Sequence, residues 1–253
     1  MLSFQLGGFV DFAYSSIMKR IPIFLAVATL AQLSLADDNG ELIFEDDFER
    51  AESQEEKDEP GNGWGTNSKS RAKGDKQVDL KDGTMRIYVS ERADHAVSVT
   101  QPFEFSDGAI GLRYMLEKPK DSLGLNFADA QYKAVHAGHL FMVKVSAKNV
   151  QINDLKTGNM DLKMREARQT DTLTDEQKAL LKTKQVTFPR ENKAGQWYNL
   201  LVEVKGDALT VSIDGEEVGS FKSEGIAHPT KRMLRLSVPK DAVVDELKIW
   251  RKN

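Results

Sequence analysis

Short segments in which apolar and polar residues alternate dominate this chain of 253 residues. Met85, Ile87 and Val89 alternate with polar residues, and Ile110 to Leu116 repeats the same period. Because successive side chains of a strand point to opposite faces, period two predicts a strand with one buried face. Similar strands are expected at 97–99, 123–127, 140–145, 200–204, 209–213, 218–221, 234–238 and 243–250. Many short strands separated by turn residues predict an antiparallel β-sandwich or barrel.

Turn residues join several of these segments into hairpins. Lys205-Gly206-Asp207 separates two strongly alternating segments, and Asp214-Gly215 follows the second of them. An Asp-Gly pair between alternating segments is typical of a tight β-hairpin turn. By contrast, the acidic stretch 49–59 and the basic stretch 69–76 carry no alternation, and we expect them to form a long solvated connection.

One segment breaks the strand pattern. Residues 160–183 are rich in helix formers, and Thr174 with Gln177 forms a capping-box pattern. We therefore expect one or two helices in an insertion at about residues 159–190, between a strand that ends near Asp154 and a strand that begins at Trp197. Such an insertion decorates a rim of the sandwich, as a lid, a partner surface or a plain structural excursion.

The N-terminal region is typical of a secretory signal peptide, which we assign to residues 18–36. Lys19 and Arg20 form a positive region, an apolar run follows at 21–33, and Ser34-Leu35-Ala36 supplies the small residues of a cleavage site. The apolar run is too short for a membrane span and is followed by acidic residues. We therefore predict an exported protein, periplasmic or extracellular, with no membrane span in its mature form.

Residues 1–17 precede this unit, and Met18 is the natural initiator, so we interpret 1–17 as an upstream extension from a start assigned too early. The mature chain, 37–253, suits one domain. A net charge of −4 with mixed signs argues against a nucleic-acid partner. The absence of cysteine excludes disulfides, thiolate metal sites and a cysteine nucleophile.

Three segments carry a resemblance to a known superfamily. They are Phe44–Arg50 followed by Gly63-Trp64, then Trp197–Val204 with Leu209–Gly215, and finally Val244–Trp250. Together they resemble the concanavalin A-like lectin/glucanase superfamily, and the second resembles the laminin G-type signature. The chain is most similar to secreted bacterial proteins of the 3-keto-disaccharide hydrolase domain family. The resemblance implies an all-β, antiparallel jelly-roll sandwich and a carbohydrate ligand, although one sandwich hosts lectins, lyases and hydrolases.

The resemblance also implies a calcium ion. Many domains of this superfamily hold a structural calcium between the first and last strands, and Asp47 and Asp245 lie in those segments. Carboxylate oxygens are the hard ligands that calcium prefers. The other interpretation is that both acids cap turns and stay solvated. Glu45, Asp47 and Glu49 also have the spacing of a glycosidase acid triad, but Phe44 and Phe48 indicate that the opposite face is buried.

Polar residues interrupt otherwise apolar central strands. If these strands form one concave sheet, their side chains line a sugar groove. The candidate ligand-binding residues are Arg113 and Asn126 on strands, with Tyr132 and Trp64 in flanking loops as stacking faces. The candidate catalytic residues are Asp129, His136, His139 and Asp154, with Asp154 as the general base. The alternative is an ordinary solvent-facing side of a sheet.

These observations leave two functions open. The first is an exported carbohydrate-binding sandwich, which as an enzyme would hydrolyse a glycosidic linkage. The second is a non-catalytic adhesion or scaffold domain that binds a protein partner through the helical insertion. A concave, polar cleft favours the sugar, whereas a flat sheet beside an apolar helix favours a protein.

Overall fold

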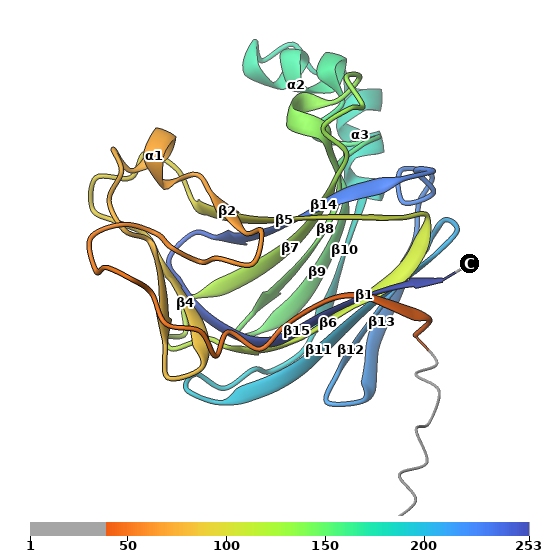
Figure 1. The fold of residues 1–253 in the computed structure, drawn as a ribbon. Helices are drawn as coiled ribbons and strands as arrows, with labels where there is room; N and C mark the ends of the chain where they lie inside the picture. Colours follow the sequence, from red (N-terminus) through yellow and green to blue (C-terminus); the bar gives the residue numbers. More distant parts are fainter. Residues whose placement is uncertain (1–38, 253) are drawn as a thin grey trace, which may run out of the picture. The chain divides into compact units, whose positions relative to one another are not determined.

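The computed structural model describes residues 39–252, which form two antiparallel sheets packed face to face (Figure 1). The predicted antiparallel β-sandwich is confirmed. The extension at 1–17 and the signal peptide at 18–36 lie outside the described residues. Within 39–252, no helix is long and apolar enough to cross a membrane.

The first sheet, sheet A, has eight strands. In spatial order they are β13 (Glu216–Lys222), β12 (Ala208–Ile213), β11 (Trp197–Lys205), β6 (Asp107–Met115), β15 (Asp241–Lys252), β4 (Thr84–Tyr88) and β3 (Val78–Lys81), with β1 (Glu41–Asp46) also paired to β15. The first and last strands of the domain thus lie side by side, with Leu42 opposite Trp250.

The second sheet, sheet B, has seven strands. In spatial order they are β10 (Gln185–Pro189), β9 (Asn149–Asp154), β8 (His139–Ser146), β7 (Ser122–Ala128), β14 (Lys231–Val238), β5 (Val97–Phe105) and β2 (Gly65–Thr66). Strand β14 comes late in the sequence, yet it lies between β5 and β7.

The core lies between the sheets, where the alternating apolar side chains meet. On β12, Leu209, Val211 and Ile213 are fully buried. Strand β7 differs because all seven of its residues are buried, including the polar Asn126 on its outer face. Burial of both faces means that other parts of the chain enclose the outer side of sheet B around β7.

Helices stand on that outer side. Helix α1 (Ser68–Arg71) lies at one flank of sheet B, and α2 (Leu162–Gln169) and α3 (Asp175–Thr183) rise at the other (Figure 1). The capping box of Thr174 and Gln177 is confirmed at the start of α3. The end of the predicted insertion is a strand, β10, which pairs with β9. The Asp214-Gly215 turn is also confirmed, and both residues have positive φ.

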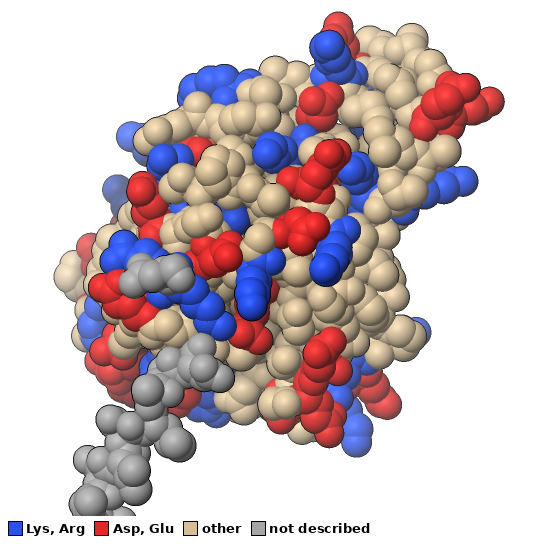
Figure 2. All heavy atoms as spheres, turned by 90° about the vertical axis from the view of Figure 1, so that its right-hand side faces the viewer, with Lys and Arg blue, Asp and Glu red and all other residues tan. Residues whose placement is uncertain are grey.

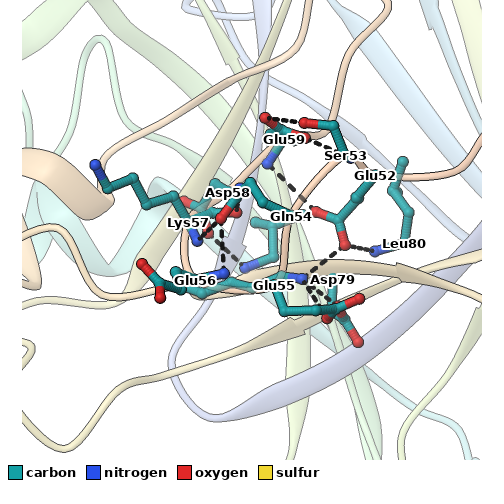
Figure 3. Close-up of polar contacts among 12 residues, drawn as sticks. Glu52, Ser53, Gln54, Glu55, Glu56, Lys57, Asp58, Glu59, Asp79 and Leu80 are labelled. Atoms are coloured by element: carbon teal, nitrogen blue, oxygen red, sulfur yellow. Dashed lines mark hydrogen bonds and ion pairs between the residues drawn. The ribbon is translucent and has the colours of Figure 1, made fainter.

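The acidic stretch at 49–59 is a largely exposed connection, as its composition indicates, but it is also anchored to the domain. The Glu52 carboxylate is buried, lies 2.7 Å from the Lys76 ammonium and accepts a hydrogen bond from the Leu80 amide, the latter drawn in Figure 3. Glu59 accepts hydrogen bonds from Ser53 in the same loop. Because Lys76 also pairs with Asp79, opposite charges neutralise one another and the loop packs against β3.

Candidate functional site

A cavity of about 630 Å³ lies over the outer face of sheet B, between α1 and α2. Strands of the sheet contribute Ser98, Asn126, His139, Met142, Arg235 and Ser237 to its floor. The surrounding segments contribute Asn67, Arg71, His95, Ala96, His136, Ala137, Leu155, Met160 and Arg165. The volume is within the range of small-molecule sites.

Strand alternation and register bring the floor residues together. Leu234 and Leu236 are fully buried in the core, so Arg235 between them points outward into the cavity. Arg235 is directly opposite Asn126 in the pairing of β14 with β7. His139 begins β8, on the other side of β7, where the register shifts by a bulge. Three neighbouring strands therefore place Arg235, Asn126 and His139 side by side.

His139 is held as a neutral imidazole. Its Nδ1 lies 2.9 Å from Asn126 Oδ1. An amide oxygen only accepts hydrogen bonds, so Nδ1 carries the proton and Nε2 carries the lone pair, with Arg235 Nη1 3.5 Å away. Burial, and secondarily the positive charge of Arg235, lower the pKa of His139 to about 4. At neutral pH the cavity floor thus contains an unprotonated imidazole nitrogen, which is able to accept a proton.

Arg235 supplies a cation next to that ring. Its Nη1 lies 3.2 Å from Nδ1 and 3.5 Å from Nε2 of His139, and its Nη2 donates a hydrogen bond of 2.7 Å to the Ala137 carbonyl. Burial lowers the pKa of Arg235, yet a guanidinium remains protonated in proteins. Within residues 39–252, Arg235 has no carboxylate partner.

The backbone of the adjoining loop is shaped to reach this arginine. Ala137 and Gly138 both have positive φ, of 50° and 71°. A Cβ on Gly138 would lie 2.2 Å from the Asp129 carbonyl oxygen, so only glycine fits there. Left-handed backbone at a non-glycine residue costs about 1–2 kcal/mol, and such strain concentrates at functional sites.

Charge distinguishes this cavity from an acidic cleft. Three arginines and three histidines line it, and no Asp or Glu side chain of the described residues does. His136 is exposed at the rim, and its ring centroid lies 6.4 Å from that of His139. Burial, Arg165 and Arg235 together lower the pKa of His136, so it too is neutral at pH 7. The cavity is therefore cationic through its arginines.

Two predicted catalytic acids lie outside this cavity. Asp154 is buried at the end of β9, and its carboxylate accepts hydrogen bonds from Thr157, Ser223 and the Gly225 amide. These donors tie the insertion to the segment before β14. Both oxygens of the Asp154 carboxylate thus accept hydrogen bonds from protein donors, which is typical of a structural carboxylate.

Asp129 is similarly occupied. Its carboxylate accepts hydrogen bonds from the Gln131 amide and from Arg232, at 2.8 Å and 2.7 Å, and lies 3.2 Å from His228 Nε2. Its own amide donates to the Gly138 carbonyl. Asp129 thereby fixes both ends of the loop that presents His136 and His139, without lining the cavity itself.

The two strand residues predicted to bind a ligand lie on different sheets. Asn126 is on the cavity floor, but Arg113 lies on β6 of sheet A, where it contacts Asp245 and Glu246 and stacks over Trp197. The chain crosses from sheet A to sheet B between Met115 and Ser122, and alternation alone does not reveal such a crossing.

Neither predicted aromatic residue faces the cavity. Trp64 is buried, packs on Phe48 and donates Nε1 to Asp46 Oδ2 over 2.7 Å. Tyr132 packs against His228, with ring centroids 4.8 Å apart, and lines a separate pocket beside Ala137 and Arg235. A large aromatic next to glycine in a loop is typical of both stacking faces and core anchors, and here Trp64 is a core anchor.

Asp47 and Asp245, the predicted calcium ligands, each have contacts within the protein. Asp47 accepts a hydrogen bond from the Glu49 amide, and Asp245 lies 3.3 Å from an Arg113 nitrogen. Within residues 39–252, no three His, Asp or Glu side chains converge as metal ligands. Calcium binding needs six to eight oxygens and stays a prediction that these contacts do not support.

Arg235, Arg165, Arg71 and His95 line the cavity but are not among the residues expected from the sequence. The segment Leu234-Arg235-Leu236 follows the ordinary pattern of a strand with one solvated face. Its only signal is that it ends a stretch rich in cations, from Lys231 to Arg235. That Arg235, Arg165, Arg71 and His95 share one cavity is visible only once the elements are placed next to each other.

The two sheets define an antiparallel sandwich of the concanavalin A-like kind. The chain belongs to the family of 3-keto-alpha-glucoside-1,2-lyase-like domains, whose model matches residues 40–244. The expected membership in the 3-keto-disaccharide hydrolase domain family is thereby confirmed. No curated protein matches the chain.

Solved structures confirm the concanavalin A-like fold. A GlcNAcα1-4Gal-releasing endo-β-galactosidase from Clostridium perfringens has a TM-score of 0.56 at 10% identity, covering 84% of this chain and 63% of its own. The family GH16 endo-β-1,3(4)-glucanase SCLam also has a TM-score of 0.56, at 12% identity and with coverages of 85% and 92%. LamA from Z. galactanivorans, bound to laminaritriose and laminaritetraose, has a TM-score of 0.51 at 14% identity, with coverages of 83% and 98%. Identities this low show the fold alone.

Proposed function

We propose that this protein binds a glycoside in the cavity over sheet B and cleaves it by elimination from a 3-keto sugar. The observation that carries the proposal is the neutral His139 imidazole beside the unpaired Arg235 on the cavity floor. The family description supports a 3-keto-glucoside as substrate. The cavity, rather than a flat sheet, favours this function over a scaffold domain that binds protein.

The composition of the cavity argues against ordinary glycoside hydrolysis. That reaction uses two carboxyl groups, about 5–9.5 Å apart, on either side of the scissile bond. The described part of the chain puts no carboxylate into the cavity wall. Asp129 and Asp154 are occupied by protein donors. Elimination needs instead one base and one group that stabilises negative oxygen.

The chain can supply both. A carbonyl at C3 of the sugar acidifies the hydrogen at C2, and His139 Nε2 takes that proton. The electron pair moves onto the C3 oxygen, where the adjacent Arg235 guanidinium stabilises the developing charge. When the carbonyl re-forms, a double bond forms between C1 and C2, and the bond from C1 to the glycosidic oxygen breaks.

The leaving oxygen then takes up one proton, which balances the one removed from C2. His136 lies at the rim of the same cavity and is placed to relay a proton between solvent and that oxygen. A base with a pKa near 4 is weak, but carboxylate bases of about that pKa abstract protons next to ketones in other enzymes. Addition of water at C1 would complete a net hydrolysis.

A nitrophenyl α-glucoside oxidised at C3 tests this proposal. The full-length protein should release nitrophenol from it and leave the unoxidised glucoside intact. His139→Gln should lower kcat by about 10²–10⁴-fold, since it removes the proton acceptor. Lys144→Gln, on the same strand but outside the cavity, is the matched control and should keep full activity.

Two outcomes would contradict the proposal. The first is hydrolysis of the unoxidised glucoside at a similar rate, which would indicate chemistry without the ketone. The second is unchanged turnover in His139→Gln with a native unfolding midpoint. Export from the cytoplasm is a separate proposal, supported by the pattern at 18–36, and is checked by determining the N-terminus of the secreted protein.

A further inference from the structure

We propose that the glycoside bound in this cavity carries an anionic substituent, a carboxylate, sulfate or phosphate, which Arg165 and Arg71 receive at the cavity rim. This inference rests on the proposed function, because it assigns the class of sugar to the same cavity. It concerns the residues around the reacting centre rather than His139 and Arg235 themselves.

The first observation is an excess of positive charge. Arg165, on α2, is half-buried, and its guanidinium contacts only the neutral Gln169, at 2.9 Å. Arg71, on α1, lies 3.6 Å from Asp94, and both side chains are about half exposed or more. Exposed pairs of this kind contribute about 0–1 kcal/mol, so Asp94 neutralises Arg71 only weakly. With Arg235, the cavity contains three guanidinium groups and no lining carboxylate of the described residues.

The second observation is that arginines without a carboxylate partner are concentrated at the cavity. Among residues 39–252, only Arg165, Arg168 and Arg235 lack a carboxylate partner, and two of these three line the cavity. The paired arginines include Arg50, Arg86, Arg113, Arg232 and Arg251. On the face shown in Figure 2, basic and acidic side chains are interspersed. The net charge of the chain is −4, so the cationic cavity is not a result of a basic composition.

The placement of the arginines divides their roles. Arg235 is on the sheet floor beside His139, whereas Arg71 and Arg165 come from helices on opposite flanks of sheet B (Figure 1). A sugar ring on the floor therefore has its reacting atoms near Arg235 and its outer substituents near the helices. A guanidinium binds carboxylate and other oxyanions through paired hydrogen bonds. A neutral sugar would leave Arg165 and Arg235 without a counter-charge among the described residues.

Calorimetric titration of the full-length protein tests the inference with matched methyl α-glycosides. The panel is the neutral glucoside, the glucuronoside, the 6-sulfate and the 6-phosphate, each with and without a ketone at C3. At least one anionic glycoside should bind tenfold or more tighter than the neutral one, which is about 1.4 kcal/mol. Raising salt from about 50 to 500 mM should weaken the anionic ligand and leave the neutral one nearly unchanged. Comparison of the three anionic sugars identifies which oxyanion is preferred.

Substitution of single arginines tests which side chain causes the preference for an anionic glycoside. Arg165→Gln should reduce the preference for the anionic glycoside several-fold, while Arg168→Gln, on the same helix but outside the cavity, should leave it unchanged. Equal, salt-independent affinity for neutral and anionic glycosides would overturn the inference and leave the proposed function intact. Failure of every glycoside to bind, with or without a ketone at C3, would overturn the proposed function and this inference together.

Discussion

The outer faces of the two sheets each present an arginine on a central strand, but the two arginines have different surroundings. Arg113 on β6 lies within 3.3 Å of both Asp245 and Glu246 and stacks over Trp197. Arg235 on β14 has a histidine, a backbone carbonyl and open cavity around it. The charge of Arg113 is balanced by two carboxylates of the domain, whereas the described residues place no carboxylate beside Arg235.

The same contrast separates the acids. Asp129 and Asp154 are buried and accept hydrogen bonds from several protein donors, so their environments are complete. Buried polar groups that have all their hydrogen-bond partners stabilise a structure. Asp129 and Asp154 are of this kind, whereas His139 and Arg235 face the cavity, so we expect the acids to support the structure.

Replacing each of these two arginines with glutamine should give the largest difference in kcat. Arg235→Gln should lower kcat on the 3-keto-glucoside by about 10²–10³-fold, because it removes the cation facing the developing oxyanion. Its free energy of unfolding should fall by no more than about 3 kcal/mol, since no ion pair is lost but the hydrogen bond to the Ala137 carbonyl is. Arg113→Gln should keep full turnover. Equal losses of kcat in both variants would show that charge on either sheet acts nonspecifically.

Removing a carboxylate that accepts hydrogen bonds from several protein donors should lower stability and leave turnover unchanged. Asp154→Ala should lower the free energy of unfolding by about 3–5 kcal/mol, measured in urea, because it leaves several buried donors unpaired. Asp154→Asn keeps acceptor capacity and should lose less. At a temperature where Asp154→Asn is folded, its kcat should remain close to native. A kcat reduced by a thousandfold in that folded variant would make Asp154 the base.

The free energy of unfolding should depend on pH through His139. The folded-state pKa of His139, about 4, is below its ordinary value of 6.5, so the unfolded chain binds more protons between these values. Stability should therefore fall as pH falls from 6.5 to 4, by on the order of 3 kcal/mol at most from this group. His139→Gln should flatten that slope in urea unfolding measured across pH. A slope that is unchanged in the variant would assign the effect to other groups.

The smallest effect on the free energy of unfolding is expected at Arg113, on the outer face of sheet A, where the charges are balanced. Arg113→Gln should lower the free energy of unfolding by at most about 1 kcal/mol, since surface ion pairs contribute little even when several meet. High salt should reduce the difference from the native protein. A loss of several kcal/mol would mean that the contact with Trp197 matters more than the charges.

Period-two alternation predicted the strands because burial of one face leaves a direct record in the sequence. The Asp214-Gly215 hairpin and the Thr174 capping box were predictable for the same reason, since both depend on neighbours along the chain. The order of strands within a sheet leaves no such record. Arg113 and Asn126 look equivalent in the sequence, yet they lie on different sheets.

The site was predictable in part. His136, His139 and Asn126 are polar residues at unusual positions in apolar segments, and all three line the cavity. Arg235 and Arg165 were not predictable, because a strand arginine and a helix arginine are ordinary on a solvated face. What makes them unusual is the absence of nearby carboxylates, and that depends on residues far away in the sequence.

The position of β14 has a consequence for how this protein is made. His139 and Arg235 are 96 residues apart in the chain, and β14 separates β5 from β7 in sheet B. Until residues 231–238 have left the ribosome, β5 and β7 have no partner on those edges, and open strand edges promote aggregation. The cavity floor is thus completed only near the end of synthesis, so a chain truncated before β14 would lack Arg235 and be prone to aggregate.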